Sequence, residues 1–330
     1  MSKNTVLEPF HIGLKILILR WALDFFSVMN YERNLTTLKM QNTGSTMQPF
    51  SVGDFLNYLK KTEMFPDSWK NHQLIIDLLN RLERADILVR AGTKNSPGIG
   101  NCYYFMRVFT EKQKQGIYWL GNAIGNDLLP YLLSQNIVQI TGRNTDGDIQ
   151  AGSGIFINPT MILTCEHVLN DMNIDEVQII NGQEKQVVNH QSHSKIDVGI
   201  IELDSPCFEN VNQVVFAEPK VLDEVYVMGF PKIPFTREAI IITQRGEVNS
   251  TNATSFDGSK VFFFSAIARP GNSGGPIVSI DGHIIGIVSK DFSSANETSM
   301  PFYAGIPTSE IMIALSDINK NITLPLENYE

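Results

Sequence analysis

Three segments in the C-terminal half carry side chains that could together hydrolyse an acyl bond. His167 comes two residues after the apolar run "MILTC", Asp197 begins "DVGIIEL", and Ser273 lies in the small-residue loop "GNSGGP". Hydrolysis through a serine needs a base for the hydroxyl proton, a carboxylate that orients this base, and backbone N–H groups that face the developing oxyanion. We therefore predict a triad of Ser273, His167 and Asp197, with the N–H groups of Gly271 and Ser273 as the oxyanion hole.

Each of these residues has a simpler explanation when it is considered alone. A histidine near a strand end is usually structural, as we expect for His190, His193 and His283, and a serine among glycines is ordinary turn sequence. Asp204 is an alternative acid, although its context "ELDSP" is typical of a turn. The three segments in the order His, Asp, Ser favour an assembled triad over a decayed relative that only holds peptides.

The sequence around the triad is typical of a β-rich domain. From about residue 137, short apolar runs alternate with turn residues, and almost no helical pattern occurs before Thr308. Many short strands at this spacing predict an all-β barrel or sandwich. The three candidate residues would then lie at the ends of strands or in the turns that join them.

The segments "ILTCEHVL", "DVGIIEL", "GNSGGP" and "GIVS" resemble the trypsin-like serine peptidases of the chymotrypsin fold, and among these the HtrA type. The resemblance covers roughly residues 135–320. It implies two β-barrels with the site between them and peptide-bond hydrolysis through an acyl-enzyme. We expect neither a cofactor nor a metal ion in this chemistry.

The chain departs from the trypsin-like pattern at two places. Asn272 stands where many of these enzymes have an aspartate that pairs with a new N-terminal amine, and a neutral amide cannot form that ion pair. No PDZ domain of the HtrA kind fits in the residues after Leu315. We therefore expect no conventional zymogen, and an oxyanion loop that is ordered by a partner, a ligand or the N-terminal domain.

The resemblance also implies a pocket for the residue that precedes the cleaved bond. Its floor would lie at Ile267, and its walls near Ser289, Asp291 and Phe302. Because no acid stands at the floor, we expect cleavage after small or medium apolar residues and not after Lys or Arg.

The first part of the chain reads as mainly helical. Apolar periodicity predicts helices over 12–29, 50–65 and 67–87, with Asp67 or Ser68 as the N-cap of the last, then strands over 87–90 and 103–109 and a linker helix over 118–133. Three helices followed by a hairpin resemble a winged helix-turn-helix domain. We therefore predict an α+β multidomain protein with a winged-helix-like domain over 1–134 and an all-β double-barrel peptidase domain over 135–330.

Charge distinguishes the two parts. Residues 1–135 carry 15 Lys and Arg against 11 Asp and Glu, whereas residues 136–330 carry 11 against 24. The excess of four positive charges in the first part is modest, so we favour a protein partner over DNA for the winged-helix-like segment, with DNA binding as the alternative. Helix 12–29 would also suit a homo-oligomer, and the second part would bind a protein or peptide substrate.

Cysteine use and hydropathy bear on the compartment. Cys102, Cys165 and Cys207 are too few and too far apart for a disulfide framework or a metal-ligand spacing, which favours a reducing compartment. Lys15 and Arg20 interrupt the apolar stretch at 12–29, so we expect no membrane span. We therefore predict a cytoplasmic protein.

Two functions from different classes fit these observations. The first is an intracellular serine endopeptidase regulated or targeted by its N-terminal domain, a plan shared by effector proteases of bacterial defence or stress systems. The second is a DNA-binding winged-helix regulator whose peptidase-like domain senses peptides or cleaves itself. The intact set of His167, Asp197 and Ser273 favours the first.

Overall fold

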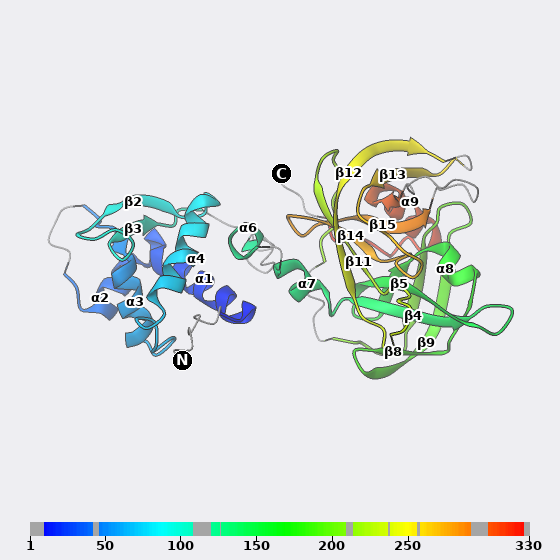
Figure 1. Ribbon diagram of the computed structural model, residues 1–330, viewed down its shortest axis with the longest axis horizontal. Coiled ribbons are helices and arrows are strands. Elements are labelled where there is room, and N and C mark those ends of the chain that lie inside the picture. The colour runs from blue at the N-terminus through cyan, green and yellow to red at the C-terminus, as the bar shows by residue number, and fades with distance from the viewer. Residues whose placement is uncertain are drawn as a thin grey trace, which may run out of the picture. The chain divides into compact units, whose positions relative to one another are not determined.

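The chain divides into two compact units, Met1–Leu128 and Leu129–Glu330 (Figure 1). The computed structural model describes residues 10–41, 46–107, 120–125, 127–208, 214–236, 238–255, 258–291 and 303–326. The sequence had suggested a boundary between residues 134 and 135, slightly later in the chain. Among the helices of the described ranges, none is both long and apolar enough to cross a membrane.

The N-terminal unit holds helices and a small sheet, as predicted. Its elements are α1 (Ile12–Phe26), the 3-10 helix η1 (Val28–Asn30), α2 (Tyr31–Leu38), β1 (Phe50–Ser51), α3 (Val52–Lys61), α4 (His72–Arg84), β2 (Val89–Thr93), β3 (Asn101–Tyr104) and α6 (Gly121–Ile124). The three strands lie in the order β1-β3-β2. Helix α2 was not predicted, because its sequence "YERNLTTL" is mostly polar and buries only Tyr31, Asn34 and Leu35.

Local hydrogen bonds decide where two of the helices begin. Ser51 and Asp54 form a reciprocal capping box, so α3 begins just after β1. The prediction that Asp67 or Ser68 caps α4 is wrong, because α4 begins after Asn71. Ser68 is buried and donates its hydroxyl to the carbonyl of Leu56 at 2.9 Å, so it holds a turn between the helices instead.

The hairpin and the linker also differ in detail from their predictions. Strand β2 is exposed along its whole length, whereas β3 is largely buried between β1 and β2. Residues 108 and 109 of the predicted second strand lie outside the described residues. The predicted linker helix is broken into α6 and α7 (Leu128–Leu133), because Gly125, with φ of 97°, ends α6.

The C-terminal unit begins with a seven-stranded antiparallel sheet. Its members are β4 (Ile137–Arg143), β5 (Ile149–Asn158), β6 (Met161–Thr164), β7 (Asn173–Ile174), β8 (Val177–Ile180), β9 (Gln183–Ser192) and β10 (Gly199–Leu203), in the order β7-β4-β5-β6-β10-β9-β8. The buried amide of Gln178 joins β8 to β4 on the other side, since it accepts from the Thr141 N–H at 2.9 Å and donates to the Thr141 carbonyl at 3.0 Å. Strands β8 and β4 are thus joined by a side chain and are not paired as neighbouring strands. The sheet is therefore a half-barrel and not a closed barrel.

The second part of this unit is a closed six-stranded barrel (Figure 1). Its strands are β11 (Glu224–Gly229), β12 (Ile242–Thr254), β13 (Lys260–Phe264), β14 (Pro276–Ser279), β15 (Ile284–Asp291) and β16 (Tyr303–Pro307), in the order β11-β12-β13-β16-β15-β14. Its core is aliphatic and aromatic, with Val227, Phe262 and Ile277 fully buried, and helix α9 (Thr308–Ile318) contacts β15 and β16. The predicted double-barrel fold is thus present as one closed barrel and one half-barrel.

Candidate active site

His167 lies in the first turn of a short helix, α8 (Glu166–Asn170), and not in the strand that precedes it. The helix follows directly on β6, and its buried Val168 and Leu169 fix it to the half-barrel. Strand β10 pairs with β6 so that Gly199 faces Thr164. This register brings Asp197, just before β10, beside His167, just after β6.

Both oxygens of the Asp197 carboxylate contact one imidazole nitrogen of His167, and one of them also accepts the His167 backbone N–H. Nδ1 of His167 lies 2.9 Å from both Asp197 oxygens, and the His167 backbone N–H donates to Oδ1 at 3.0 Å. The hydroxyl of Ser289 donates to Oδ2 at 2.5 Å. Ser289, predicted as a pocket wall, thus directs its hydroxyl to the acid of the predicted triad.

These contacts determine the charge of the acid and the tautomer of the base. Burial by itself would raise the pKa of Asp197, but the hydrogen bond and charge of His167, with the Ser289 hydroxyl, lower the pKa to about 2. An ionised carboxylate can only accept, so Nδ1 must carry the imidazole proton. The lone pair of a neutral His167 is then on Nε2, where a general base needs it.

Ser273 occupies a turn that lies against the strand leading to His167. Its carbonyl accepts from the Ser153 N–H at 2.8 Å, and its side chain is half-buried. At the next residue, a Cβ on Gly274 would come within 2.2 Å of the Thr164 hydroxyl and 3.0 Å of the Cys165 nitrogen. Only glycine permits this approach, at φ of 80°, which brings the nucleophile's turn to the strand end beside the base.

The two N–H groups predicted as the oxyanion hole belong to Gly271 and Ser273. Within the described ranges, no hydrogen-bond acceptor is found for the N–H of Gly271 or that of Ser273. The Pro270 carbonyl accepts from the Lys232 N–H at 3.0 Å, and in a trans peptide the next N–H points the opposite way. Gly271 adopts φ of 100°, a conformation that an L-residue rarely takes.

Ser153, which the sequence analysis missed, joins the half-barrel to this loop. Its side chain is fully buried; the hydroxyl donates to the Gly271 carbonyl at 2.6 Å and accepts from the Phe230 N–H at 2.8 Å. The available signal was a polar residue inside "GSGIFI", an otherwise apolar strand with glycines on both sides. Ser153 thus orients the loop that carries the oxyanion hole.

Asn272 lies in the same loop and is almost completely buried. Its side chain is 1% exposed, and within the described part of the chain its Oδ1 has no hydrogen-bond partner. Its backbone is fixed, since the N–H donates to Arg269 and the carbonyl accepts from Gly275, both at 2.9 Å. The loop is therefore held by its main chain and not by an ion pair at Asn272.

The predicted specificity pocket is only partly described. Ile267 is 45% exposed, as a pocket floor open to a substrate can be. Phe302 and the side chain of Asp291 lie outside the described residues. The assignment of Ile267, Ser289, Asp291 and Phe302 to this pocket stays a prediction.

The alternative residues have structural roles. Asp204 accepts from the Gln186 N–H at 3.2 Å and from its neighbour Ser205, as a turn aspartate does. His193 accepts two backbone N–H groups on Nδ1, from Lys195 and Ile196, and pairs with Asp317 through Nε2 at 3.2 Å. Neither replaces a member of the triad.

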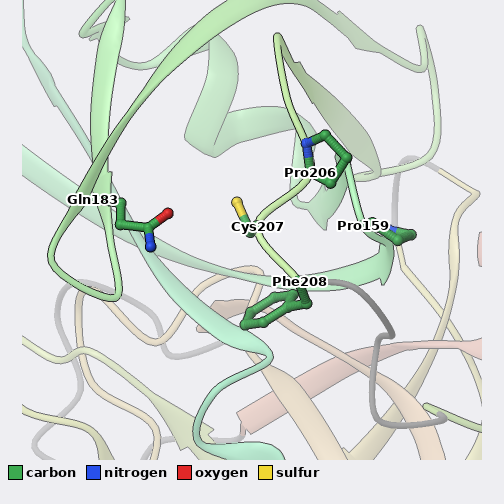
Figure 2. Close-up of a pocket in the computed structure, with 5 residues that line it drawn as sticks. All are labelled: Pro159, Gln183, Pro206, Cys207 and Phe208. Carbon is green, nitrogen blue, oxygen red and sulfur yellow. The ribbon is translucent and has the colours of Figure 1, made fainter.

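A separate pocket of about 470 Å³ lies on the half-barrel (Figure 2). It is lined by Pro159, Gln183, Pro206, Cys207 and Phe208. Figure 2 shows the Cys207 thiol on the side of Gln183, and burial raises the pKa of this thiol, so that it is neutral at ordinary pH. None of the triad residues lines this pocket.

Comparisons with known proteins find similarity to peptidases. The trypsin-like peptidase domain family matches residues 152–287. A curated relative, the probable periplasmic serine protease do/HhoA-like of Haemophilus influenzae, is 28% identical over 142 residues, which cover 41% of this chain and 30% of that protein. The chain therefore spans less than a third of this relative's length.

Solved structures of two proteases are also similar. The active form of the Rv3671c protease from M. tuberculosis aligns with a TM-score of 0.48 and 18% identity over 61% of this chain and 88% of that one. The HtrA-type protease AlgW with a tripeptide aligns with a TM-score of 0.47 and 21% identity, covering 58% and 63% of the two chains. The family match spans residues 152–287, which include His167, Asp197 and Ser273, so this part of the C-terminal unit is similar to a trypsin-like peptidase domain.

Proposed function

We propose that this chain is a serine endopeptidase whose N-terminal unit regulates or targets it. The observation that supports this most strongly is the set of bonds on Asp197. The carboxylate is ionised, fixes His167 through Nδ1 and is itself held by Ser289. A structural histidine would not need an acid held from two sides, whereas a general base does.

In the first half of the reaction, the Ser273 hydroxyl attacks the carbonyl carbon of the scissile peptide bond. Its proton passes to Nε2 of His167, and the imidazolium is stabilised by Asp197. The negative charge on the substrate oxygen is met by the N–H groups of Gly271 and Ser273. The proton on Nε2 then passes to the leaving amine, the C–N bond breaks, and Ser273 remains as an ester.

In the second half, water replaces the amine. His167 accepts a proton from this water, whose oxygen attacks the ester carbon, and the same two N–H groups hold the oxyanion. The ester bond breaks, Ser273 regains its proton from Nε2, and the acid product leaves. Protonation and deprotonation balance over the cycle, so the residues of this chain suffice for the reaction.

A fluorophosphonate probe tests the proposal on the full chain. We expect it to label wild type and to fail with Ser273→Ala, because only an activated serine attacks the phosphorus. His167→Ala should also abolish labelling, although Ser273 is still present. Wild-type protein that is folded but unlabelled would instead favour the alternative, a DNA-binding regulator with a peptide-sensing domain.

We further propose that the enzyme cleaves after small or medium apolar residues. This rests on Ile267, an uncharged and partly exposed side chain six positions before the nucleophile. A peptide library should be cut after Val, Ala or Leu, and Ile267→Asp should add cleavage after Lys or Arg, since a carboxylate there would attract a basic side chain. Cleavage after Lys or Arg by wild type would reject this pocket.

For the N-terminal unit we propose a winged-helix-like module that binds a protein. Two of its exposed basic side chains, Lys70 and Arg90, are paired with an acid or an internal acceptor. Arg90 donates to Asn101 at 2.7 Å and lies 3.6 Å from Glu83, and Lys70 pairs with Asp67 at 2.7 Å. Phosphate binding requires cations that are free to neutralise the nucleic-acid backbone, so these pairs favour a protein partner over DNA.

Gating by this unit is tested by hydrolysis of a short apolar peptide. Residues 131–330, checked for folding by circular dichroism, are compared with the full chain, each with and without candidate protein partners and double-stranded DNA. We expect the two rates to differ, because a ligand can change the activity only through a difference in affinity for two states of the loop. Equal rates under every condition would show that the N-terminal unit only targets the enzyme.

A cytoplasmic location and a role in a bacterial defence or stress system complete the proposal. The location is supported by three free cysteines, of which Cys102 and Cys165 are buried. The role rests on analogy with proteases that join a sensing module to a peptidase. Cell fractionation would test the location, and recovery of the chain from the periplasm would overturn it.

A further inference from the structure

The buried Cys165 brings a thiol to the catalytic acid and base. One donor atom each from Cys165, His167 and Asp197 lies within 4.8 Å of the other two. Cys165 is fully buried, and its thiol donates to the Val288 carbonyl at 3.0 Å. The spacing of the three cysteines had predicted no metal site, but it could not show that a histidine and an aspartate complete a ligand set around one of them.

We propose that these three side chains form an inhibitory site for a thiophilic divalent cation of the zinc class. A thiolate, an imidazole nitrogen and a carboxylate oxygen are the donors that Zn²⁺ binds, at about 2.3, 2.0 and 2.0–2.2 Å in a tetrahedral arrangement. Donors at such bond lengths lie about 3.3–3.6 Å apart. The three donor atoms, which lie within 4.8 Å of one another, would have to move closer together to reach this geometry.

The charges of the ligands and the hydrogen bonds around them favour binding of the cation between Cys165, His167 and Asp197. The thiolate and the ionised Asp197 together neutralise two positive charges, which reduces the cost of placing a cation in a largely buried site. When the thiol gives up its proton, the Val288 carbonyl keeps another donor, because it also accepts from the Gly274 N–H at 2.8 Å. No buried backbone group is left without a partner by this change.

Binding would stop the peptidase through the tautomer of His167, and in this respect the inference rests on the proposed function. The cation takes the lone pair of Nδ1, so the imidazole proton resides on Nε2. One proton, from the Cys165 thiol, is released to solvent, and nothing is oxidised or reduced. A protonated Nε2 cannot accept the proton of Ser273, and Asp197, now a ligand, no longer orients the base.

The first test is inhibition of the full chain by ZnCl₂, with each variant compared with its own zinc-free rate. We expect EDTA to reverse the inhibition, and both Cys165→Ala and Cys165→Ser to raise the half-inhibitory zinc concentration by about tenfold or more, because a thiolate ligand is lost. Cys207→Ala is the matched control, a half-buried free thiol away from the triad, and should leave the zinc response unchanged. Equal zinc sensitivity of wild type and both Cys165 variants would overturn the proposal.

The second test needs no catalysis. The full chain carrying Ser273→Ala is titrated with CdCl₂, and thiolate-to-metal charge-transfer absorption is recorded. We expect one equivalent to give a band that is lost when Cys165→Ser is added and kept when Cys207→Ala is added. A band that does not depend on Cys165 would overturn the site. A Cys165-dependent band, together with a wild-type chain that shows no peptidase activity, would keep the metal site and reject the proposed function.

Discussion

The half-barrel and the closed barrel differ in what they contribute to the site. The half-barrel supplies the base and the acid, His167 and Asp197, which are positioned by the pairing of neighbouring strands β6 and β10. The closed barrel supplies the nucleophile Ser273 and the N–H groups for the oxyanion, on a loop before β14. In the proposed mechanism, the half-barrel therefore handles the proton of Ser273 and the closed barrel handles the acyl group.

The two sides are joined by a few hydrogen bonds between residues distant in sequence. Ser153 of the half-barrel holds the carbonyls of Gly271 and Ser273, and Cys165 donates to Val288. In the other direction, Ser289 of the barrel holds Asp197. We expect catalytic geometry to depend on these hydrogen bonds as well as on the proposed triad, and the following substitutions separate the two contributions.

We expect the largest loss of activity from removing the nucleophile on the closed barrel or the base on the half-barrel. Ser273→Ala and His167→Ala should each lower kcat by about 10⁶-fold, because the triad members act as one unit. The double variant should be no slower than either single one. Rates of hydrolysis of a short apolar peptide give the measurement, and a double variant that is slower by the product of the two losses would show that the two sides act independently.

Asp197→Asn should lower kcat by roughly 10⁴-fold, since an amide in this position can leave the imidazole in the wrong tautomer. Asp204→Asn is the matched control, because Asp204 accepts backbone and hydroxyl donors in a turn outside the triad. The two variants are compared in the same peptide assay. Full activity of Asp197→Asn together with a loss in Asp204→Asn would reassign the acid.

Ser153→Ala tests the cross-link without touching the reacting groups. We expect kcat to fall by about 10–100-fold with little change in KM, because Gly271 would lose its anchor and its N–H would drift from the oxyanion. Ser265→Ala is the control, since Ser265 also accepts a backbone N–H, from Glu247 at 2.9 Å, but on another part of the barrel. A loss confined to KM, or an equal loss in both variants, would deny Ser153 a positioning role.

Asn272→Asp should have the smallest effect of these substitutions, and we expect it in the free energy of unfolding. A carboxylate in this buried place would lack a donor, so its folded pKa would lie above the unfolded value of about 3.9. The variant would match wild type in acid and lose about 1–2 kcal/mol of unfolding free energy as the pH rises through the raised pKa. Urea unfolding of both proteins at pH 4 and pH 8 measures this, and a difference independent of pH would mean that the new carboxylate has found a donor.

Much of the chemistry could be predicted from the sequence because it depends on local signals. The small residues around Ser273 predicted a turn with free N–H groups, and the apolar runs after Asp197 and before His167 predicted the strands that bring the two together. Helix α2 and the start of α4 could not be predicted in this way. Helix α2 is mostly polar. The start of α4 follows a turn in which the buried Ser68 hydroxyl donates to the Leu56 carbonyl.

The amino-acid sequence by itself determined which residues could form a triad and that strands lie next to them, since residue type and local periodicity depend on the sequence alone. Only the tertiary structure decided the contacts between the half-barrel and the barrel: Ser153 on Gly271, Ser289 on Asp197, and Cys165 on Val288. The physical reason is that each of these joins residues about 90 to 120 positions apart. No local periodicity reports such a contact, which forms only when strand register and barrel closure bring the two segments together.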